Sequence, residues 1–263
     1  MLKIYTLTWN GKGKLEKLYP SLISNLKNID YEWYIKSNGC TDETKDLKEI
    51  WNNDKVHIIN YEHNKDNFSK GCNYLHSISN SKENDLVLLL NNDVIFNDSV
   101  SLSNMINLIT KDNEIGIVGA KLKYTDTDII QHAGVVMANN KYPIHHGARS
   151  KEDKNSFLNK EFQAVTGAVM LTRAKDFYLD EKYNWCFEDI DYCLDIKYNK
   201  NKKVICCGAT NIFHEESATL KKNPINKLFL PLNLSYFATK WHAKIPVDYD
   251  IYARNPKHMI YNK

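Results

Sequence analysis

The stretch Leu86-Val-Leu-Leu-Leu-Asn-Asn-Asp93 says most about how this chain folds. Five apolar residues are followed directly by Asn91, Asn92 and Asp93. An apolar run this short, bounded by polar residues, is typical of a strand that is buried on both faces of a sheet. In an open α/β sheet, ligands bind just beyond the carboxyl ends of the strands. Asp93 is therefore well placed to hold a divalent cation against a diphosphate, although Asn and Asp are equally typical of a helix N-cap.

The composition is that of a folded globular chain. Its 263 residues suffice for one large or two small domains, and a hydrophobic content of 43% excludes a disordered chain. A net charge of only +3 gives no indication of nucleic-acid binding. No apolar stretch approaches the ~18 residues of a membrane-spanning helix, and the first residues lack a signal-peptide core, so we expect a cytoplasmic protein. The six cysteines form no C-x-x-C pair, which favours buried, reduced thiols over disulfides or a zinc site.

The first part of the chain alternates between strand and helix patterns. We expect strands at 2–8, 31–36, 56–61 and 86–90, and helices at 14–28, about 42–51 and 68–78. This order predicts an α/β fold whose central sheet is mostly parallel, with right-handed crossovers. Pro20 weakens the prediction of the first helix, because a proline inside a helix removes a hydrogen bond.

The pattern changes after Asp93. Helices are expected at 99–109 and 188–198, a polar loop at 137–160, and strands at 115–118, 122–124, 164–171, 203–206 and 210–213. Residues 224–245 are rich in Leu, Phe, Tyr and Trp. They indicate either a helix that packs against the protein or a partner copy, or a weak interfacial membrane helix. Pro231 and the small number of flanking cations favour packing.

Short motifs follow one another in a fixed order along residues 3–217. They are Leu7-Thr-Trp-Asn-Gly11, Ser37-Asn-Gly-Cys-Thr-Asp42, Asn67-Phe-Ser-Lys-Gly-Cys-Asn73, Leu90-Asn-Asn-Asp93, Ile115-Gly-Ile-Val-Gly-Ala-Lys-Leu122, Ile130-Gln-His-Ala-Gly134, Val165-Thr-Gly-Ala168 and Phe187-Glu-Asp-Ile-Asp191, with His214 after the last expected strand. Each motif is weak alone, but their succession resembles the inverting glycosyltransferases of family 2, especially the rhamnosyltransferase-like branch. The resemblance implies a GT-A fold in which a single domain spans residues 1–223. Residues 1–98 would form its nucleotide-sugar half and 99–223 its acceptor half, followed by a helical extension at 224–263.

The resemblance also implies roles for individual residues. Asp189 would be the general base that takes the proton of the acceptor hydroxyl. Read alone, Glu188-Asp189-x-Asp191 is more typical of acidic residues that stabilise a helix N-terminus, and Asp191 is expected to be structural. Asp93 and His214 would hold Mn²⁺ or Mg²⁺, since imidazole is an acceptable ligand for Mn²⁺, although a lone histidine is usually no ligand.

Two further groups of residues follow from the same resemblance. The donor nucleotide would be bound by Thr8, Trp9, Asn10, Ser37, Asn38, Asp42, Lys70, Asn91 and Asn92. The acceptor would be bound by Glu188, Trp185, Gly167 and His146, although a loop without a role is an equal alternative for His146. Ser37 stands where the family usually has an aspartate that reads the base, which leaves the preference for uracil or thymine open.

We therefore expect a metal-dependent inverting glycosyltransferase of polysaccharide biosynthesis. Its donor would be a UDP- or dTDP-linked sugar and its acceptor a glycan or lipid-linked hydroxyl, with a homodimer and weak contact with the inner membrane surface as options. One alternative is a nucleotidyltransferase, but Lys12 and Lys14 do not form the Gly-rich basic loop which that class requires. The other is a non-catalytic binding module on the same fold, against which the presence of both Asp93 and Asp189 argues.

Overall fold

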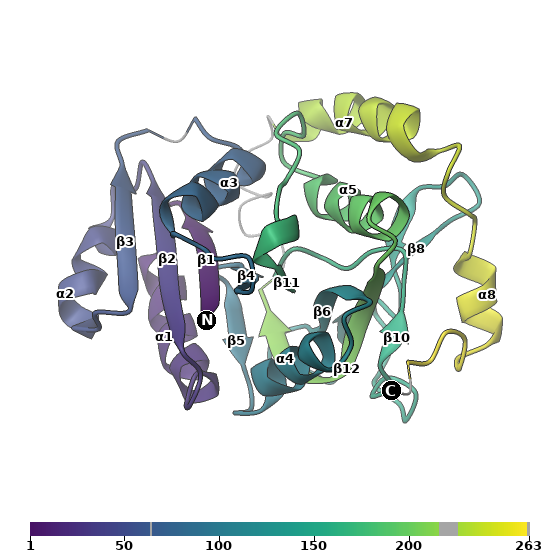
Figure 1. The fold of residues 1–263 in the computed structure, drawn as a ribbon, viewed down its shortest axis with the longest axis horizontal. Coiled ribbons are helices and arrows are strands. Elements are labelled where there is room, and N and C mark those ends of the chain that lie inside the picture. Colours follow the sequence, from purple (N-terminus) through teal and green to yellow (C-terminus); the bar gives the residue numbers. More distant parts are fainter. Residues whose placement is uncertain (64, 216–225, 262–263) are drawn as a thin grey trace.

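The computed structural model describes residues 1–63, 65–215 and 226–261 (Figure 1). The first part consists of β1 (Leu2–Thr8), α1 (Lys12–Asn25), β2 (Tyr31–Asn38), η1 (Glu43–Asp46), α2 (Leu47–Trp51), β3 (Val56–Tyr61), α3 (Phe68–Ile78) and β4 (Leu86–Leu90). The second part begins with β5 (Val94–Phe96), α4 (Ser101–Lys111), β6 (Ile115–Lys123), β7 (Ile130–His132), β8 (Val135–Met137), β9 (Pro143–His145) and β10 (Lys160–Glu161). It continues with β11 (Val169–Arg173), η2 (Ala174–Asp176), α5 (Glu188–Leu194), η3 (Asp195–Asn199), β12 (Lys203–His214), α7 (Asn226–Trp241) and α8 (Tyr249–Arg254).

One large sheet runs through the molecule in the order β10-β12-β6-β11-β4-β1-β2-β3. The strands β4, β1, β2 and β3 pair in parallel, as the β-α alternation predicts, and β6 pairs in parallel with β12. The strand β11 is antiparallel to both β4 and β6 and so joins the two parallel parts. The predicted α/β fold is confirmed.

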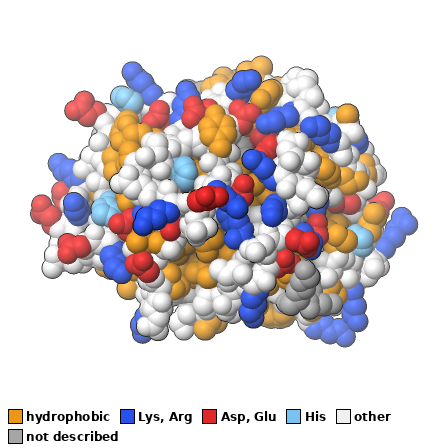
Figure 2. All heavy atoms as spheres, viewed as in Figure 1, with side chains coloured by type: hydrophobic (Ala, Val, Ile, Leu, Met, Phe, Trp, Pro, Cys, Tyr) orange, Lys and Arg blue, Asp and Glu red, His pale blue; other side chains and the backbone are white. Residues whose placement is uncertain are grey.

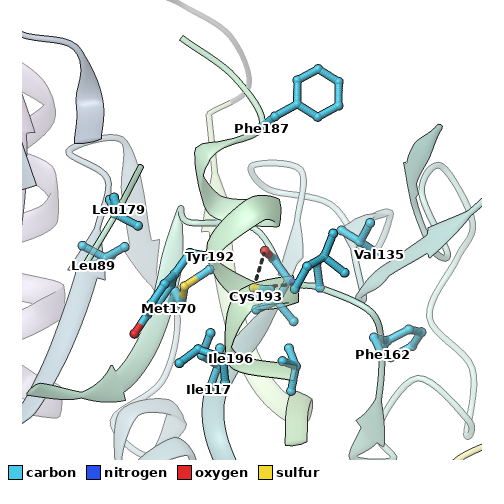
Figure 3. Packing of buried hydrophobic residues seen from close by; sticks show 14 of the residues in the cluster. Leu89, Ile117, Val135, Phe162, Met170, Leu179, Phe187, Tyr192, Cys193 and Ile196 are labelled. Atoms are coloured by element: carbon cyan, nitrogen blue, oxygen red, sulfur yellow. Dashed lines mark hydrogen bonds between the residues drawn. The ribbon is translucent and has the colours of Figure 1, made fainter. Parts of the chain in front are cut away.

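Helices cover both faces of this sheet and create two cores (Figure 1). Apolar residues of α1, α2 and α4 pack on one face, and those of α3, α5 and α7 pack on the other. Figure 3 shows the second core around α5, where Tyr192 and Cys193 lie among Met170, Ile117 and Ile196. This core includes the helix whose first turn carries Glu188 and Asp189.

Several predicted boundaries in the second part were wrong. Residues 115–123 form one strand instead of two, and 203–214 form one strand with a register irregularity between Cys207 and Ile212. The predicted strand 164–171 begins only at Val169, and the helix predicted at 188–198 ends at Leu194 and continues as a π-turn. The polar loop contains the short strands β9 and β10.

The C-terminal segment packs against the domain. Phe237 and Trp241 of α7 are fully buried, whereas Leu228 and Leu232 on the same helix are 70% and 67% exposed. The helix continues through Pro231, as α1 does through Pro20. Within the described residues, no helix has the length and apolar character needed to span a membrane.

The cysteines and the surface charge agree with the sequence. All six cysteines are free, and Cys72, Cys193, Cys206 and Cys207 are buried. Figure 2 shows acidic and basic side chains interspersed over the visible face, as a small net charge predicts.

Candidate functional site

A carboxylate and an imidazole meet at the end of β4. Asp93 directly precedes β5, and β5 pairs antiparallel with the end of β12, so that His214 lies opposite Val94. His214 Nε2 lies 3.2 Å from Asp93 Oδ1. This strand pairing explains why Asp93 and His214, which are 121 positions apart in the sequence, lie side by side.

Gln131 on β7 orients the His214 ring and determines which of its nitrogens faces Asp93. Gln131 Nε2 donates to the His214 carbonyl oxygen at 3.2 Å, which fixes the amide so that its Oε1 lies 2.7 Å from His214 Nδ1. An amide oxygen only accepts, so Nδ1 carries a proton and Nε2 is the ring nitrogen that faces Asp93. A hydrogen bond of this kind on the far ring nitrogen is what orients metal-ligating histidines in general.

Lys14 in the first turn of α1 also lies at this corner. Its Nζ lies 2.9 Å from Asp93 Oδ2. Burial acts to raise the pKa of Asp93, but His214 and Lys14 outweigh burial and hold that pKa below its usual value. The carboxylate is therefore ionised at neutral pH.

The donor atoms at this corner fit a divalent cation. Asp93 Oδ1 is buried and has no hydrogen-bond partner among the described residues, because the approach of His214 lacks hydrogen-bond geometry. A carboxylate oxygen and an imidazole nitrogen thus lie beside one another, and both are groups that ligate divalent cations. The described part of the chain contains no group of three His, Cys, Asp or Glu ligands. Asp93 and His214 would leave most of the coordination to other ligands, and Mg²⁺ and similar ions take such oxygens from phosphate and water.

Asp189 lies in the first turn of α5 and is held by two backbone donors. Its Oδ2 accepts from Gly167 N at 2.8 Å and its Oδ1 from Ile190 N at 2.8 Å. A Cβ on Gly167 would lie 3.1 Å from the Asp189 Cβ, so glycine permits this close approach. The side chain remains partly exposed, and each oxygen keeps a lone pair with which to accept a proton.

Glu188 is in a different environment from its neighbour. It is buried, and its Oε2 has no hydrogen-bond partner among the described residues. Burial, and then the charge of Asp189, raise the pKa of Glu188 to about 8. The two adjacent carboxyl groups therefore differ: Asp189 accepts from two backbone donors in a partly exposed position, and Glu188 is buried and protonated at neutral pH.

One loop connects the Asp93 corner to Asp189. Asn91 N donates to Ala168 O at 2.9 Å, and Gly167 in the same loop donates to Asp189. Asn91 Nδ2 lies 3.5 Å from His214 Nε2. The end of β4, the loop before β11 and the start of α5 thus lie together at one edge of the sheet.

The predicted nucleotide-binding residues lie on the adjoining loops. Thr8 ends β1, and its Oγ1 accepts from Asn92 Nδ2 at 2.8 Å. A Cβ on Gly11 would lie 2.2 Å from that oxygen, so only glycine fits beside this pair. The loop after β1 is therefore joined to the Asn-Asn-Asp turn.

Most of the other polar groups predicted to bind the nucleotide bind the protein itself. Asn10 Oδ1 accepts from the backbone of Thr41 and Asp42, and Asp42 Oδ2 accepts from Lys12 N. The fully buried Lys36 donates to Asn38 and lies 2.9 Å from Asp66. Together these contacts fasten the loop after β1 to the loop after β2.

The remaining predicted residues differ in exposure. Ser37 is buried, whereas Trp9 is 42% exposed and Lys70 is exposed on the first turn of α3. Trp185 is partly exposed and has a positive φ of 91°. Such a backbone is costly for a bulky residue and is found more often at functional sites than elsewhere.

The structure does not bring His146 to this edge. Its ring packs against Phe162 and Tyr252, with centroids 5.3 and 5.7 Å away. Burial lowers the pKa of His146 to about 4, so the ring is neutral. Asp191 accepts from Tyr183 and Trp241 and pairs with Lys240, which confirms the structural role expected for it.

Sequence reasoning missed Lys14 and Gln131. Gln131 lies within the Ile130–Gly134 motif, so a signal was present, but only the paired hydrogen bonds to His214 identify what it does. Lys14 carries no local signal, because its contact with Asp93 depends on how α1 packs beside β5.

Comparison with solved structures identifies the fold. Neither models of protein families nor curated protein sequences match this chain. The chain is similar to GalNAc-T7 with UDP, GalNAc and Mn²⁺ (12% identity, TM-score 0.65, covering 82% of this chain and 44% of that one). It is also similar to the mannosyltransferase PcManGT from Pyrobaculum calidifontis with GDP-Man and Mn²⁺ (11%, 0.59, 82% and 57%), and to residues 1–349 of S. aureus TarS (14%, 0.55, 81% and 60%).

These similarities establish a GT-A fold of the glycosyltransferase type. The chain spans roughly half the length of these structures, from 44% to 60%. Two of them contain Mn²⁺ together with a nucleotide or nucleotide sugar.

Proposed function

We propose that this chain is a metal-dependent inverting glycosyltransferase that moves a sugar from a nucleoside-diphosphate sugar to a hydroxyl group of a glycan or lipid-linked acceptor. The observation that carries the proposal is the Asp93–His214 pair, which Gln131 orients and which one loop joins to Asp189. The donor half would be residues 1–98 and the acceptor half 99–223, so that each contributes one of the two aspartates.

Asp93 and His214 would hold Mn²⁺ or Mg²⁺. When bound, the ion supplies positive charge where the departing diphosphate becomes more negative. Lys14, which lies 2.9 Å from Asp93, is close enough to this position to add a second positive charge. Asn91 and Asn92 keep the turn in place through Ala168 and Thr8.

Asp189 would take the proton of the acceptor hydroxyl as that oxygen attacks the anomeric carbon. Its two backbone donors orient the carboxylate before the acceptor arrives, which lowers the cost of reaching the reactive geometry. Glu188 would contact the acceptor in its protonated form, as a donor of a hydrogen bond. The exposed Trp9 and the partly exposed Trp185 would add aromatic surface for the donor and the acceptor, respectively.

The proposal is tested by measuring release of free nucleoside diphosphate. The protein is incubated with UDP-, dTDP- and GDP-linked sugars, with and without Mn²⁺, and released nucleotides and pyrophosphate are separated by chromatography. Release of diphosphate only with Mn²⁺ supports the proposal, and NMR of the product then reports inversion. Release of pyrophosphate indicates a nucleotidyltransferase, and tight binding without any release indicates a non-catalytic module.

A further inference from the structure

A cavity of about 250 Å³ lies beside β7, away from the Asp93–Asp189 edge. Its walls come from β7, the segment 146–160, β12 and α8, and they include His146, Lys160, Phe162, Cys206 and Tyr252. Pockets for drug-sized ligands begin at about 300 Å³, so this cavity has room for about one sugar ring.

Lys160 is the residue of the cavity wall that most clearly indicates a bound ligand. Its side chain is only 6% exposed, and it has no hydrogen bond or ion pair with any of the described residues. Its ammonium group is not cut off from solvent, because it reaches the cavity that Lys160 lines. A charge this far withdrawn from water is normally paired. Burial accordingly lowers the pKa of Lys160, although Asp153 opposes that effect.

The nearby carboxylates are engaged elsewhere. Asp153 accepts from the backbone of Asn155 and Ser156 and from both of their side chains, within its own loop. Glu152 pairs with Lys121, the other buried lysine in the cavity wall. Lys160 therefore presents an unpaired positive charge to the cavity.

Part of the wall is aromatic. The rings of Phe162 and Tyr252 stack with centroids 4.7 Å apart, and the neutral ring of His146 lies against both. The Ser150 hydroxyl donates its proton to Gly147 O and keeps a lone pair for a ligand hydroxyl. A cation, an aromatic wall and a hydroxyl thus surround a volume of one ring.

We propose that this cavity binds a hydroxylated carboxylate of the size of one sugar ring, such as a hexuronate, with its carboxylate on Lys160. The cavity is separate from the Asp93 corner, and occupation of it requires neither a donor nor a cation. The proposal therefore stands or falls independently of the glycosyltransferase assignment.

The test is isothermal titration of the full chain with glucuronate, glucose and inorganic phosphate, without nucleotide or metal. We expect glucuronate to bind, and glucose and phosphate to bind at least tenfold more weakly, because each lacks one of the two recognised features. Lys160→Met keeps the apolar stem but removes the charge, and it should weaken glucuronate binding at least tenfold. Lys160→Arg should retain part of the binding. Lys27→Met, which replaces an exposed lysine in the turn after α1, should retain all of it.

Thermal unfolding of each variant checks that the fold is retained. Because the methionine variant removes an unpaired buried charge, its stability should equal or exceed that of the parent. Absence of glucuronate binding to the parent, equal binding of glucose or phosphate, or full binding by Lys160→Met would each overturn the proposal.

Discussion

Gln131→Leu should weaken Mn²⁺ binding without any direct loss of a ligand. The substitution removes the oxygen that accepts from His214 Nδ1 at 2.7 Å and the donor to the His214 carbonyl at 3.2 Å. The imidazole is then free to rotate or to move its proton to Nε2, which would point a hydrogen at the position of the cation. Loss of such an outer hydrogen bond typically costs 10- to 100-fold in metal affinity, which corresponds to about 1.4–2.7 kcal/mol.

The affinity is measured by electron paramagnetic resonance of free Mn²⁺, in the presence and absence of UDP. Gln131→Glu provides a graded comparison, because it keeps the acceptor for Nδ1–H but loses the donor to the carbonyl. It should therefore retain more affinity than the leucine variant. This ordering separates orientation of His214 from a general loss of packing.

Gln163→Leu is a matched control. Gln163 is a similarly buried amide with two hydrogen bonds, to Asp248 and Tyr198, and neither partner belongs to the Asp93 corner. Its replacement should lower stability but leave Mn²⁺ affinity unchanged. If Gln131→Leu binds Mn²⁺ within twofold of the parent, or if the control loses as much affinity, the proposed orienting role is refuted.

Other predictions concern the two aspartates, the buried glutamate and α7. Asp93→Ala should abolish Mn²⁺-dependent nucleotide binding in calorimetry, and near-normal turnover of this variant would exclude Asp93 as a ligand. Asp189→Asn should keep donor affinity but lower the transfer rate on the order of 10²–10⁴-fold; a rate within a few-fold of the parent would transfer the role of base to Glu188. Because Glu188 has a folded-state pKa raised to about 8, the native state binds the extra proton, so urea unfolding should show stability falling from about pH 5 to pH 8 in the parent and falling less in Glu188→Gln. We expect the parent not to sediment with anionic vesicles; salt-sensitive sedimentation that is lost when Leu228 and Leu232 are both changed to Ser would show that the exposed face of α7 binds membranes.

The first half of the fold could be predicted from the sequence because its strands and helices alternate regularly along the chain. β1, β2 and β3 are neighbours in chain order with a helix after each strand, and β4 then pairs in parallel with the other side of β1. Periodicity predicts these elements and their parallel pairing. The strand Leu86–Leu90 and the helix Phe68–Ile78 have the predicted bounds. The second half failed where short apolar runs on either side of glycine or polar residues joined into single strands, as in Ile115–Lys123. Pairing on both sides supplies the backbone hydrogen bonds there, whatever the local propensity.

The candidate site also has features that the sequence indicates and features that only the structure shows. Motifs indicate Asp93, Asp189 and His214, because each stands at the end of a strand or the start of a helix. They do not show that Asn10 and Asp42 are occupied in joining two loops, or that His146 packs on Phe162. These contacts depend on which side chains the fold brings together in space, and spacing along the chain does not predict that.

The Asp93 corner is formed by parts of the chain that are far apart in the sequence. Three elements distant in sequence, the turn after β4, β7 and the end of β12, fix the carboxylate, the amide and the imidazole against one another. The resulting contact sets His214 Nε2 3.2 Å from a buried Asp93 oxygen that has no hydrogen-bond partner among the described residues. A carboxylate oxygen and an imidazole nitrogen are both ligands of divalent cations, and the Gln131 hydrogen bonds leave Nε2 as the ring nitrogen that faces Asp93. In the function proposed above, this corner would hold the cation that arrives with the diphosphate of the donor.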